Sequence, residues 1–212
     1  MSALDFIYRR HSVRKFKEAD VDPVHIQEII KAATYAPSGK NVQNWHFVIL
    51  KNPNKIQDIV KIVEDKNAEM ASWTDDESLK KEITKFKHYH TIFRGAPVLI
   101  LAFAGPYREM AVEAFKAKNA SSEELHNILR VSPAIQNVSA AIENLMLAAA
   151  ALGYGTCWMT GPVYAFKEIQ EYLGFHKEGY FLAAMTPLGV PEESELSSPP
   201  RKPIEEVMTI IE

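Results

Sequence analysis

Apolar residues at helical spacing define the first clear element of the chain. Asp22 and Pro23 form a typical helix start, because an aspartate side chain can accept a hydrogen bond from a free backbone N–H and proline has no N–H to lose there. The apolar positions that follow recur every three or four residues, at Ile26, Ile29, Ile30 and Ala33. This pattern predicts a helix with one buried face that ends at Ala36 and Pro37.

The stretch from Lys55 to His90 is strongly charged and helical in pattern. Its apolar residues form a single stripe, made of Ile56, Ile59, Val60 and Val63. A helix with so narrow an apolar face covers a surface rather than filling a core. We therefore expect residues 55–93 to form a variable helical region that acts as a peripheral lid.

Four segments have the composition of strands. His46–Leu50 is rich in β-branched and aromatic residues and is followed by the turn formers of residues 51–54. Pro97–Phe103 is continuously apolar, as in a central strand that is covered on both faces. Tyr154–Met159 and Phe181–Leu188 are the other two predicted strands, with a helix over Tyr164–Leu173 between them.

The most apolar helix of the chain is predicted after the polar stretch of residues 119–124. It covers Ile135–Leu152 and ends before Gly153, which suits the position after a helix C-terminus. A helix that is apolar on several sides belongs in a core or a subunit interface. The tail from Pro191 to Pro203 is rich in proline and is expected to be an extended arm. The alternation of elements predicts an α+β or α/β fold, and we favour α+β with a mixed sheet flanked by helices.

Composition limits the classes of function. The chain has 212 residues, of which 47% are hydrophobic and 24% charged, which suits one domain spanning 1–212. No signal peptide and no apolar run of about 20 residues is apparent, so we expect a cytoplasmic protein without a membrane segment. The one cysteine, Cys157, excludes an internal disulfide, and the scattered histidines indicate no metal site. A formal net charge of −3 makes a nucleic-acid partner unexpected.

Positive charge is nevertheless concentrated in the segment Arg9–Phe16, with the sequence RRHSVRKF. If it follows a short first helix, Arg10, Ser12 and Arg14 can point the same way and offer two guanidinium groups and a hydroxyl to one anion. Guanidinium groups match phosphate oxygens in a bidentate manner. The alternative is a solvated basic turn without a ligand.

Three further segments contain candidate binding residues. Residues 36–47 (APSGKNVQNWHF) form a turn with exposed backbone N–H groups and the amides of Asn41 and Gln43, or they only connect a helix to a strand. Residues 153–162 (GYGTCWMTGP) end a strand with free N–H groups at Thr160 and Gly161, whereas Trp158 and Met159 alone suggest core. Residues 199–203 (PPRKP) hold Arg201 on a stiff arm, or form a plain solvated tail.

In this order, the four segments resemble the FMN-dependent nitroreductase family, over nearly the whole chain. The resemblance implies an intertwined homodimer with two FMN sites at the interface and an extended C-terminal arm. It also implies these cofactor-binding residues: Arg10, His11, Ser12 and Arg201 at the phosphate, Arg14 near flavin N1 and O2, Pro37, Ser38, Gly39 and Asn41 from the other subunit, and Trp158, Thr160 and Gly161 near flavin N5 and O4. The family usually has proline where this chain has Asn44.

The resemblance implies an oxidoreductase in which NADH or NADPH passes hydride through flavin N5 to a nitroaromatic, quinone or similar acceptor by ping-pong turnover. No side chain is assigned as catalytic, because the cofactor supplies the chemistry. Two alternatives stay open. One is a protein that stores or senses FMN without turnover, and the other is a family member with different flavin chemistry, such as dehalogenation or enoate reduction.

Overall fold

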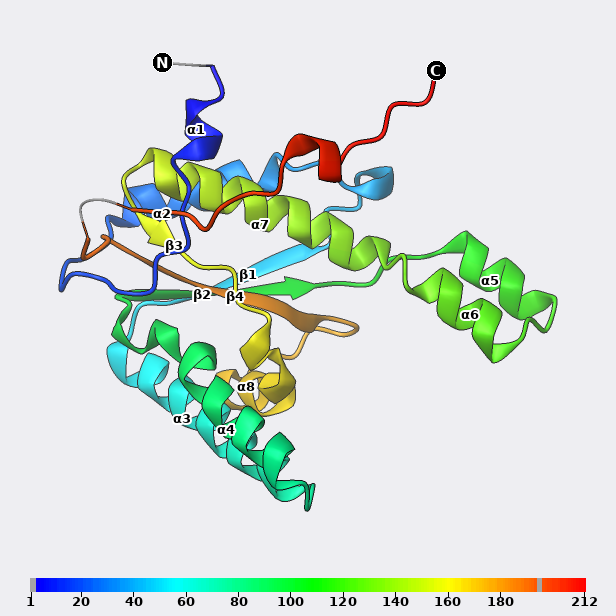
Figure 1. Ribbon diagram of the computed structural model, residues 1–212, viewed down its shortest axis with the longest axis horizontal. Helices are drawn as coiled ribbons and strands as arrows, with labels where there is room; N and C mark the ends of the chain where they lie inside the picture. The colour runs from blue at the N-terminus through cyan, green and yellow to red at the C-terminus, as the bar shows by residue number, and fades with distance from the viewer. Residues whose placement is uncertain (1–2, 194–195) are drawn as a thin grey trace.

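A four-stranded sheet forms the centre of the protein in the computed structural model, which describes residues 3–193 and 196–212. The strands are β1 (Trp45–Leu50), β2 (Val98–Ala104), β3 (Gly155–Thr156) and β4 (Phe181–Gly189), in the order β1-β2-β4-β3. All three pairings between these strands are antiparallel, and a single parallel bridge joins Ser12 to Thr156. The α+β prediction is confirmed, with helices on both faces of the sheet (Figure 1), but the sheet is antiparallel and not mixed as predicted.

Strand β2 is the central strand, as its apolar sequence predicted. Side chains of successive residues point to opposite faces of a sheet, so the strand contributes to two cores. Val98, Ile100, Ala102 and Ala104 join one buried cluster, and Leu99, Leu101 and Phe103 join the other. All seven residues of the strand are buried.

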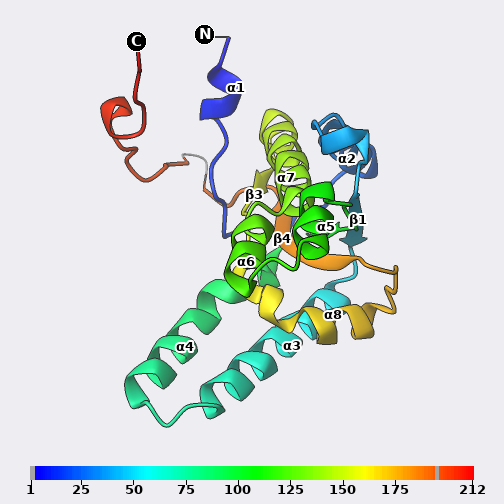
Figure 2. The ribbon, with the colours of Figure 1, turned by 90° about the vertical axis from the view of Figure 1, so that its right-hand side faces the viewer.

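The first face of the sheet is covered by α2 (Pro23–Thr34) and α7 (Pro133–Ala151). Both helices were predicted from their apolar spacing, and their inward positions pack together: Ile26, Ile29 and Ala33 with Val138, Ile142, Leu145, Met146 and Ala149. The Asp22 side chain caps α2 by accepting from the Val24 N–H at 2.8 Å, as expected. The short helix α1 (Asp5–Tyr8) lies beyond α7 with no buried residue (Figures 1 and 2).

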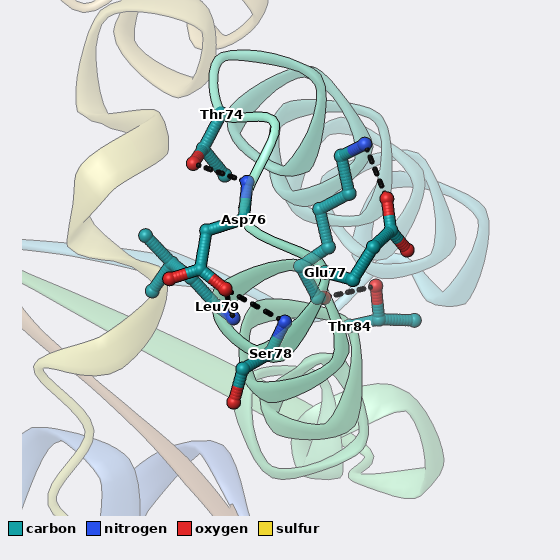
Figure 3. A network of polar contacts seen from close by, with 7 residues as sticks. Thr74, Asp76, Glu77, Ser78, Leu79 and Thr84 are labelled. Carbon is teal, nitrogen blue, oxygen red and sulfur yellow. Dashed lines mark hydrogen bonds and ion pairs between the residues drawn. The ribbon is translucent and has the colours of Figure 1, made fainter.

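The second face is covered by α3 (Pro53–Ser72) and α8 (Phe166–Leu173), and α4 (Glu77–His90) packs on α3. The stripe of Ile56, Ile59, Val60 and Val63 is buried, so α3 belongs to the core layer. Helix α4 has no buried residue. Its first turn is fixed by Asp76, which accepts from the N–H groups of Ser78 (2.8 Å) and Leu79 (3.3 Å), while the Asp76 N–H donates to Thr74 Oγ1 (Figure 3). The lid role of residues 55–93 stays a prediction.

The structure corrects the sequence prediction in two places. Only Gly155–Thr156 form strand β3, and the predicted strand over residues 154–159 is otherwise reduced to an isolated bridge between Met159 and Met185. Two helices were missed, α5 (Met110–Ala117) and α6 (Ser122–Leu129). They project from the body of the protein beside the N-terminal end of α7 (Figure 1). Ser121 and Glu124 form a capping box at the start of α6, a signal that is present in the sequence.

The tail after β4 has no helix or strand over residues 196–203 and then one short turn of helix, Ile204–Glu206. Residues 194–195 of the predicted arm lie outside the described residues. None of the helices in the described part of the chain is long and apolar enough to cross a membrane. A cytoplasmic location stays a prediction.

Candidate functional site

The basic segment, Arg9–Phe16, runs along the edge of the sheet in an extended conformation, paired with it through isolated bridges. The Val13 N–H donates to the Thr156 carbonyl at 2.8 Å, and the Lys17 N–H donates to the Val190 carbonyl at 2.9 Å. Val13 is buried against Gly155, where an added Cβ would lie 2.5 Å from the valine side chain. The backbone of the segment is therefore fixed while its cationic side chains stay near the surface.

Ser12 and Arg14 line one cavity at this segment, whereas Arg10 does not line it. The buried thiol of Cys157 lies close enough to the segment for Arg10, Ser12 and Arg14 to affect its pKa. Burial raises the pKa of Cys157, whereas the Arg14 charge, a hydrogen bond from Ser12 and the Arg10 charge act in the opposite direction. The side chain of Arg10 is 19% exposed, and its Nε lies 3.7 Å from Glu143 Oε1 on α7.

This cavity, beside the basic segment, has a volume of about 260 Å³. It is lined mainly by polar groups from the basic segment and the start of the tail: His11, Ser12, Val13, Arg14, Lys15, Glu193, Leu196 and Ser197. His11 Nδ1 lies 2.8 Å from the hydroxyl oxygen of Ser198. The N-terminal segment and the tail, distant in the sequence, meet at this cavity.

A second cavity, of about 450 Å³, shares Arg14 and Lys15 with the first. Its lining is mainly apolar and comes from the basic segment, the end of α4 with the turn that follows it, and the start of the tail: Phe16, His88, Tyr89, Thr91, Ile92, Arg94, Gly95 and Glu192. The sequence analysis assigned Arg14 to this region but missed Lys15, His88, Tyr89 and Thr91. The aromatic and basic residues at the end of α4 were the available signal.

Arg201 is exposed and is not brought into contact with Arg10, Ser12 or Arg14 within the described part of the chain. Arg201 comes three residues after Ser198, whose hydroxyl lies beside His11 in the lining of the first cavity. The place of Arg201 in a phosphate site stays a prediction.

The loop that contains Pro37, Ser38, Gly39 and Asn41 has an unusual backbone. Lys40, Asn41 and Gln43 all have positive φ (55°, 52° and 46°), which L-residues seldom adopt. Hydrogen bonds hold this conformation: the Gln43 N–H donates to Ser38 Oγ at 3.1 Å, and Gln43 Nε2 donates to Asn41 Oδ1 at 3.1 Å. Such conformations persist where the surroundings fix them, and they cluster at functional sites.

A buried pair of asparagines anchors the same loop to α7. Asn137 Oδ1 accepts from the Gly39 N–H at 3.0 Å, and Asn137 Nδ2 donates to Asn44 Oδ1 at 2.8 Å. The amide of Asn44 in turn donates to the Gly105 carbonyl at 2.9 Å. Asn44, which stands where the resembling family usually has proline, therefore has a structural role that proline could not fill.

This loop does not meet the basic segment of its own chain. It is anchored near the N-terminal end of α7, on a different side of the helix from Glu143, which contacts Arg10. Figures 1 and 2 both show the loop after α2 well apart from the N-terminal segment. The chain alone brings together the first and third predicted segments, and it leaves the second apart.

The third predicted segment, residues 153–162, contains β3 and continues beyond it. Trp158 is half-buried against the core, Thr160 is exposed, and Gly161 starts the 3-10 helix η3 (Gly161–Ala165). A Cβ at Gly161 would lie 2.3 Å from Cδ2 and 2.5 Å from Nε2 of His90. The last turn of α4 thus touches this backbone through His90 and lines the second cavity through its neighbours His88, Tyr89 and Thr91.

The protein thus combines an α+β fold with a basic segment at the sheet edge and two cavities that share Arg14 and Lys15. A sequence model of the nitroreductase family matches residues 7–190, and the chain belongs to that family of oxidoreductases. Among curated relatives, a protein of Archaeoglobus fulgidus named as a candidate NADH dehydrogenase/NAD(P)H nitroreductase is 27% identical over 91% of this chain and 87% of its own length. Human iodotyrosine deiodinase 1 is 28% identical over 98% of this chain and 68% of its own length.

Two solved structures show the same fold. A BluB-like flavoprotein from Clostridium difficile 630 is 40% identical, with a TM-score of 0.91 and complete coverage of both chains. A nitroreductase with bound FMN from Bacteroides fragilis NCTC 9343 is 23% identical, with a TM-score of 0.73 and complete coverage of both chains. The predicted family and its fold are confirmed.

Proposed function

We propose that the protein binds FMN and uses it, with NADH or NADPH, to reduce nitroaromatic, quinone or similar electron-poor acceptors. One observation carries the proposal: a small polar cavity and a larger apolar cavity adjoin at Arg14 and Lys15. FMN has a dianionic phosphate at one end and a flat aromatic system at the other. The two cavities offer the chemistry that each end requires.

The residues of the site have distinct roles in this proposal. Arg10, His11 and Ser12 would bind the phosphate, since they line or flank the polar cavity at a point of concentrated positive charge. Arg201 would close that site from the tail. Arg14, at the boundary of the two cavities, would lie near flavin N1 and O2, where a cation stabilises the negative charge of a reduced flavin.

The other edge of the flavin would meet the backbone N–H groups of Thr160 and Gly161, with Trp158 nearby. This placement fits the chain because the last turn of α4 lines the apolar cavity and also touches Gly161. When bound, the flavin supplies the chemistry by accepting hydride at N5 from the nicotinamide and passing it to the acceptor. The protein orients the reactants and contributes charge, and no side chain has to act as an acid or base.

We also propose that the protein is a homodimer in which Pro37, Ser38, Gly39 and Asn41 reach the FMN of the partner subunit. The proposal is supported by the separation of this loop from the basic segment of its own chain. Exposed apolar side chains on α1 and the C-terminal arm also suit a partner: Phe6 (46%), Ile7 (42%), Val207 (63%), Ile210 (74%) and Ile211 (91%).

Different flavin chemistry is the second candidate function. It is favoured by the relatives named iodotyrosine deiodinase, which align with 98% of this chain in the human protein. Because these relatives and the nitroreductases are about equally similar to the chain, the acceptor has to be found by experiment. A protein that stores flavin without turnover would need the same binding residues, but its flavin would stay oxidised in the test that follows.

The test is reduction of the purified protein loaded with FMN, in the absence of oxygen, by NADH and NADPH in separate runs. We expect rapid loss of the visible flavin absorption with one or both donors, and its return on addition of a nitroaromatic, a quinone or an iodinated phenol. Return with the iodinated phenol alone would favour dehalogenation. Flavin that stays oxidised with both donors would contradict an oxidoreductase and indicate a store.

A further inference from the structure

His90, the last residue of α4, packs directly on the backbone of Gly161. The ring atoms that approach Gly161 are Cδ2 and Nε2, and they would lie 2.3 and 2.5 Å from an added Cβ. Real Cβ atoms essentially never show such short contacts, so any side chain at position 161 would displace the imidazole. Only glycine permits this contact, and the contact fixes the distance between α4 and the backbone at Thr160 and Gly161.

The ring of His90 is held in one orientation by a second contact. Its Nδ1 lies 3.3 Å from the hydroxyl of Tyr164, and that hydroxyl donates its one proton to the Val63 carbonyl at 3.2 Å. With the hydroxyl proton directed at Val63, the tautomer that completes the contact with Tyr164 carries its proton on Nδ1. In the neutral ring Nε2 then carries the lone pair, on the side that faces Gly161.

The surroundings of His90 contain little charge. Asn67 and Met70 from α3, Phe86 and Glu82 from α4, and Tyr164 from η3 line a cavity of about 470 Å³ together with it. Glu82 is the one ionisable carboxyl group in this lining, and burial raises the pKa of Tyr164, so that the phenol stays neutral. Burial lowers the pKa of His90 below its ordinary value of 6.5. Burial therefore favours the neutral ring, and the pKa of His90 is reached at a lower pH than in an exposed histidine.

We propose that His90 is the positioning residue for the flavin edge of the site. It sets the place of the Thr160 and Gly161 N–H groups through its contact with Gly161, and it presents a proton-accepting nitrogen beside them. The inference rests on the proposed function, because these N–H groups matter only if a flavin lies against them. It gives α4 a specific role at the cofactor.

The contact is tested by a double-mutant cycle on FMN affinity, measured by quenching of flavin fluorescence. Gly161→Ala should weaken binding by about tenfold or more, since its methyl group displaces the imidazole. His90→Ala alone should also weaken binding, and because it makes room for the methyl group, Gly161→Ala should cost less affinity in the His90→Ala background than in the wild type. Equal loss from Gly161→Ala in both backgrounds would overturn the proposed contact.

The proton is tested by the midpoint potential of the bound flavin as a function of pH. The wild-type potential should rise additionally as pH falls below 6.5, because the charged ring stabilises a reduced flavin beside it. His90→Gln, when saturated with FMN, should lack this additional rise, whereas the control His126→Gln on α6 should keep it. An identical pH profile in His90→Gln would overturn the role of His90 while leaving the proposed function intact. A wild-type protein that does not bind FMN would refute both.

Discussion

At the level of single residues, the proposed binding of FMN depends on where each cation lies. Arg14 stands at the boundary between the two cavities, and its guanidinium Nη1 donates to the Ser12 carbonyl at 3.2 Å. This bond holds the guanidinium close to the segment that would carry the phosphate. The cavity lined by His11, Ser12 and Arg14 is the observation that favours a binding site over a plain solvated turn.

Arg14→Ala should leave FMN bound but make its midpoint potential more negative, because the charge that stabilises a reduced flavin is lost. The measurement is a redox titration of the bound flavin, with Arg14→Lys as the matched variant that keeps the charge. Arg14→Lys should return most of the potential. An unchanged potential in Arg14→Ala would contradict the place given to this residue.

Asn137→Ala should destabilise the protein and weaken FMN binding together. The change removes the acceptor of the Gly39 N–H and leaves the buried Asn44 side-chain oxygen without its donor, and a buried polar group in that state costs about 1–3 kcal/mol. Denaturant unfolding gives the stability and fluorescence gives the affinity. Asn144→Ala on the same helix is the control, since its one hydrogen bond is long at 3.4 Å. If Asn137→Ala lowered stability but not affinity, the loop would have no part in the site.

At the level of helices and strands, the pattern of apolar residues predicted those elements that are determined by interactions between residues close in the sequence. β1, β2, β4, α2, α7 and α8 follow from periods of two and 3.6 residues, and from caps such as Asp22. The missed α5 and α6 have weak apolar faces, with Val112 as the only buried residue of the two helices. β3 is short because only Gly155 and Thr156 pair with β4, and no local pattern shows how many residues a sheet edge will pair.

Helix α4 offers a test at this scale, because its start depends on one capping side chain. Asp76→Ala should destabilise the first turn of α4 by about 1 kcal/mol, since the Ser78 and Leu79 N–H groups lose their acceptor. Hydrogen exchange of the amides at the start of α4 should become faster, while exchange in β2 should not change. Asp75→Ala, next to the cap, is the control and should have little effect. Unchanged exchange in Asp76→Ala would show that α4 is held by other contacts.

At the scale of the whole molecule, sequence reasoning located the basic segment but could not place it in space. His11 lies beside Ser198, and Arg14 lines one cavity with His88 and Thr91, so residues far apart in the chain come together. Such contacts follow from the assembled sheet and not from any local signal. For the same reason the sequence could not show that His90 rests on Gly161.

The proposed dimer gives a prediction at the same scale. Removal of residues 199–212 should shift the protein from dimer to monomer and weaken FMN binding, because the removed arm carries exposed apolar residues and Arg201. Analytical ultracentrifugation measures the assembly, and Arg201→Ala in the full chain separates the loss of the cation from the loss of the arm. A truncated protein that remains a dimer would contradict the role of the arm, and a monomeric wild type would contradict the dimer itself.

The central claim is that the basic segment and the C-terminal arm bind one FMN per chain. The most direct measurement is a fluorescence titration of FMN into the wild type and into the double variant Arg10→Ala/Arg201→Ala. We predict one FMN per wild-type chain, and binding weaker by at least about 100-fold in the double variant, since each charge-assisted pair with the phosphate contributes about 1.5–3 kcal/mol. Equal affinity in the two proteins, or no binding by the wild type, would contradict the account.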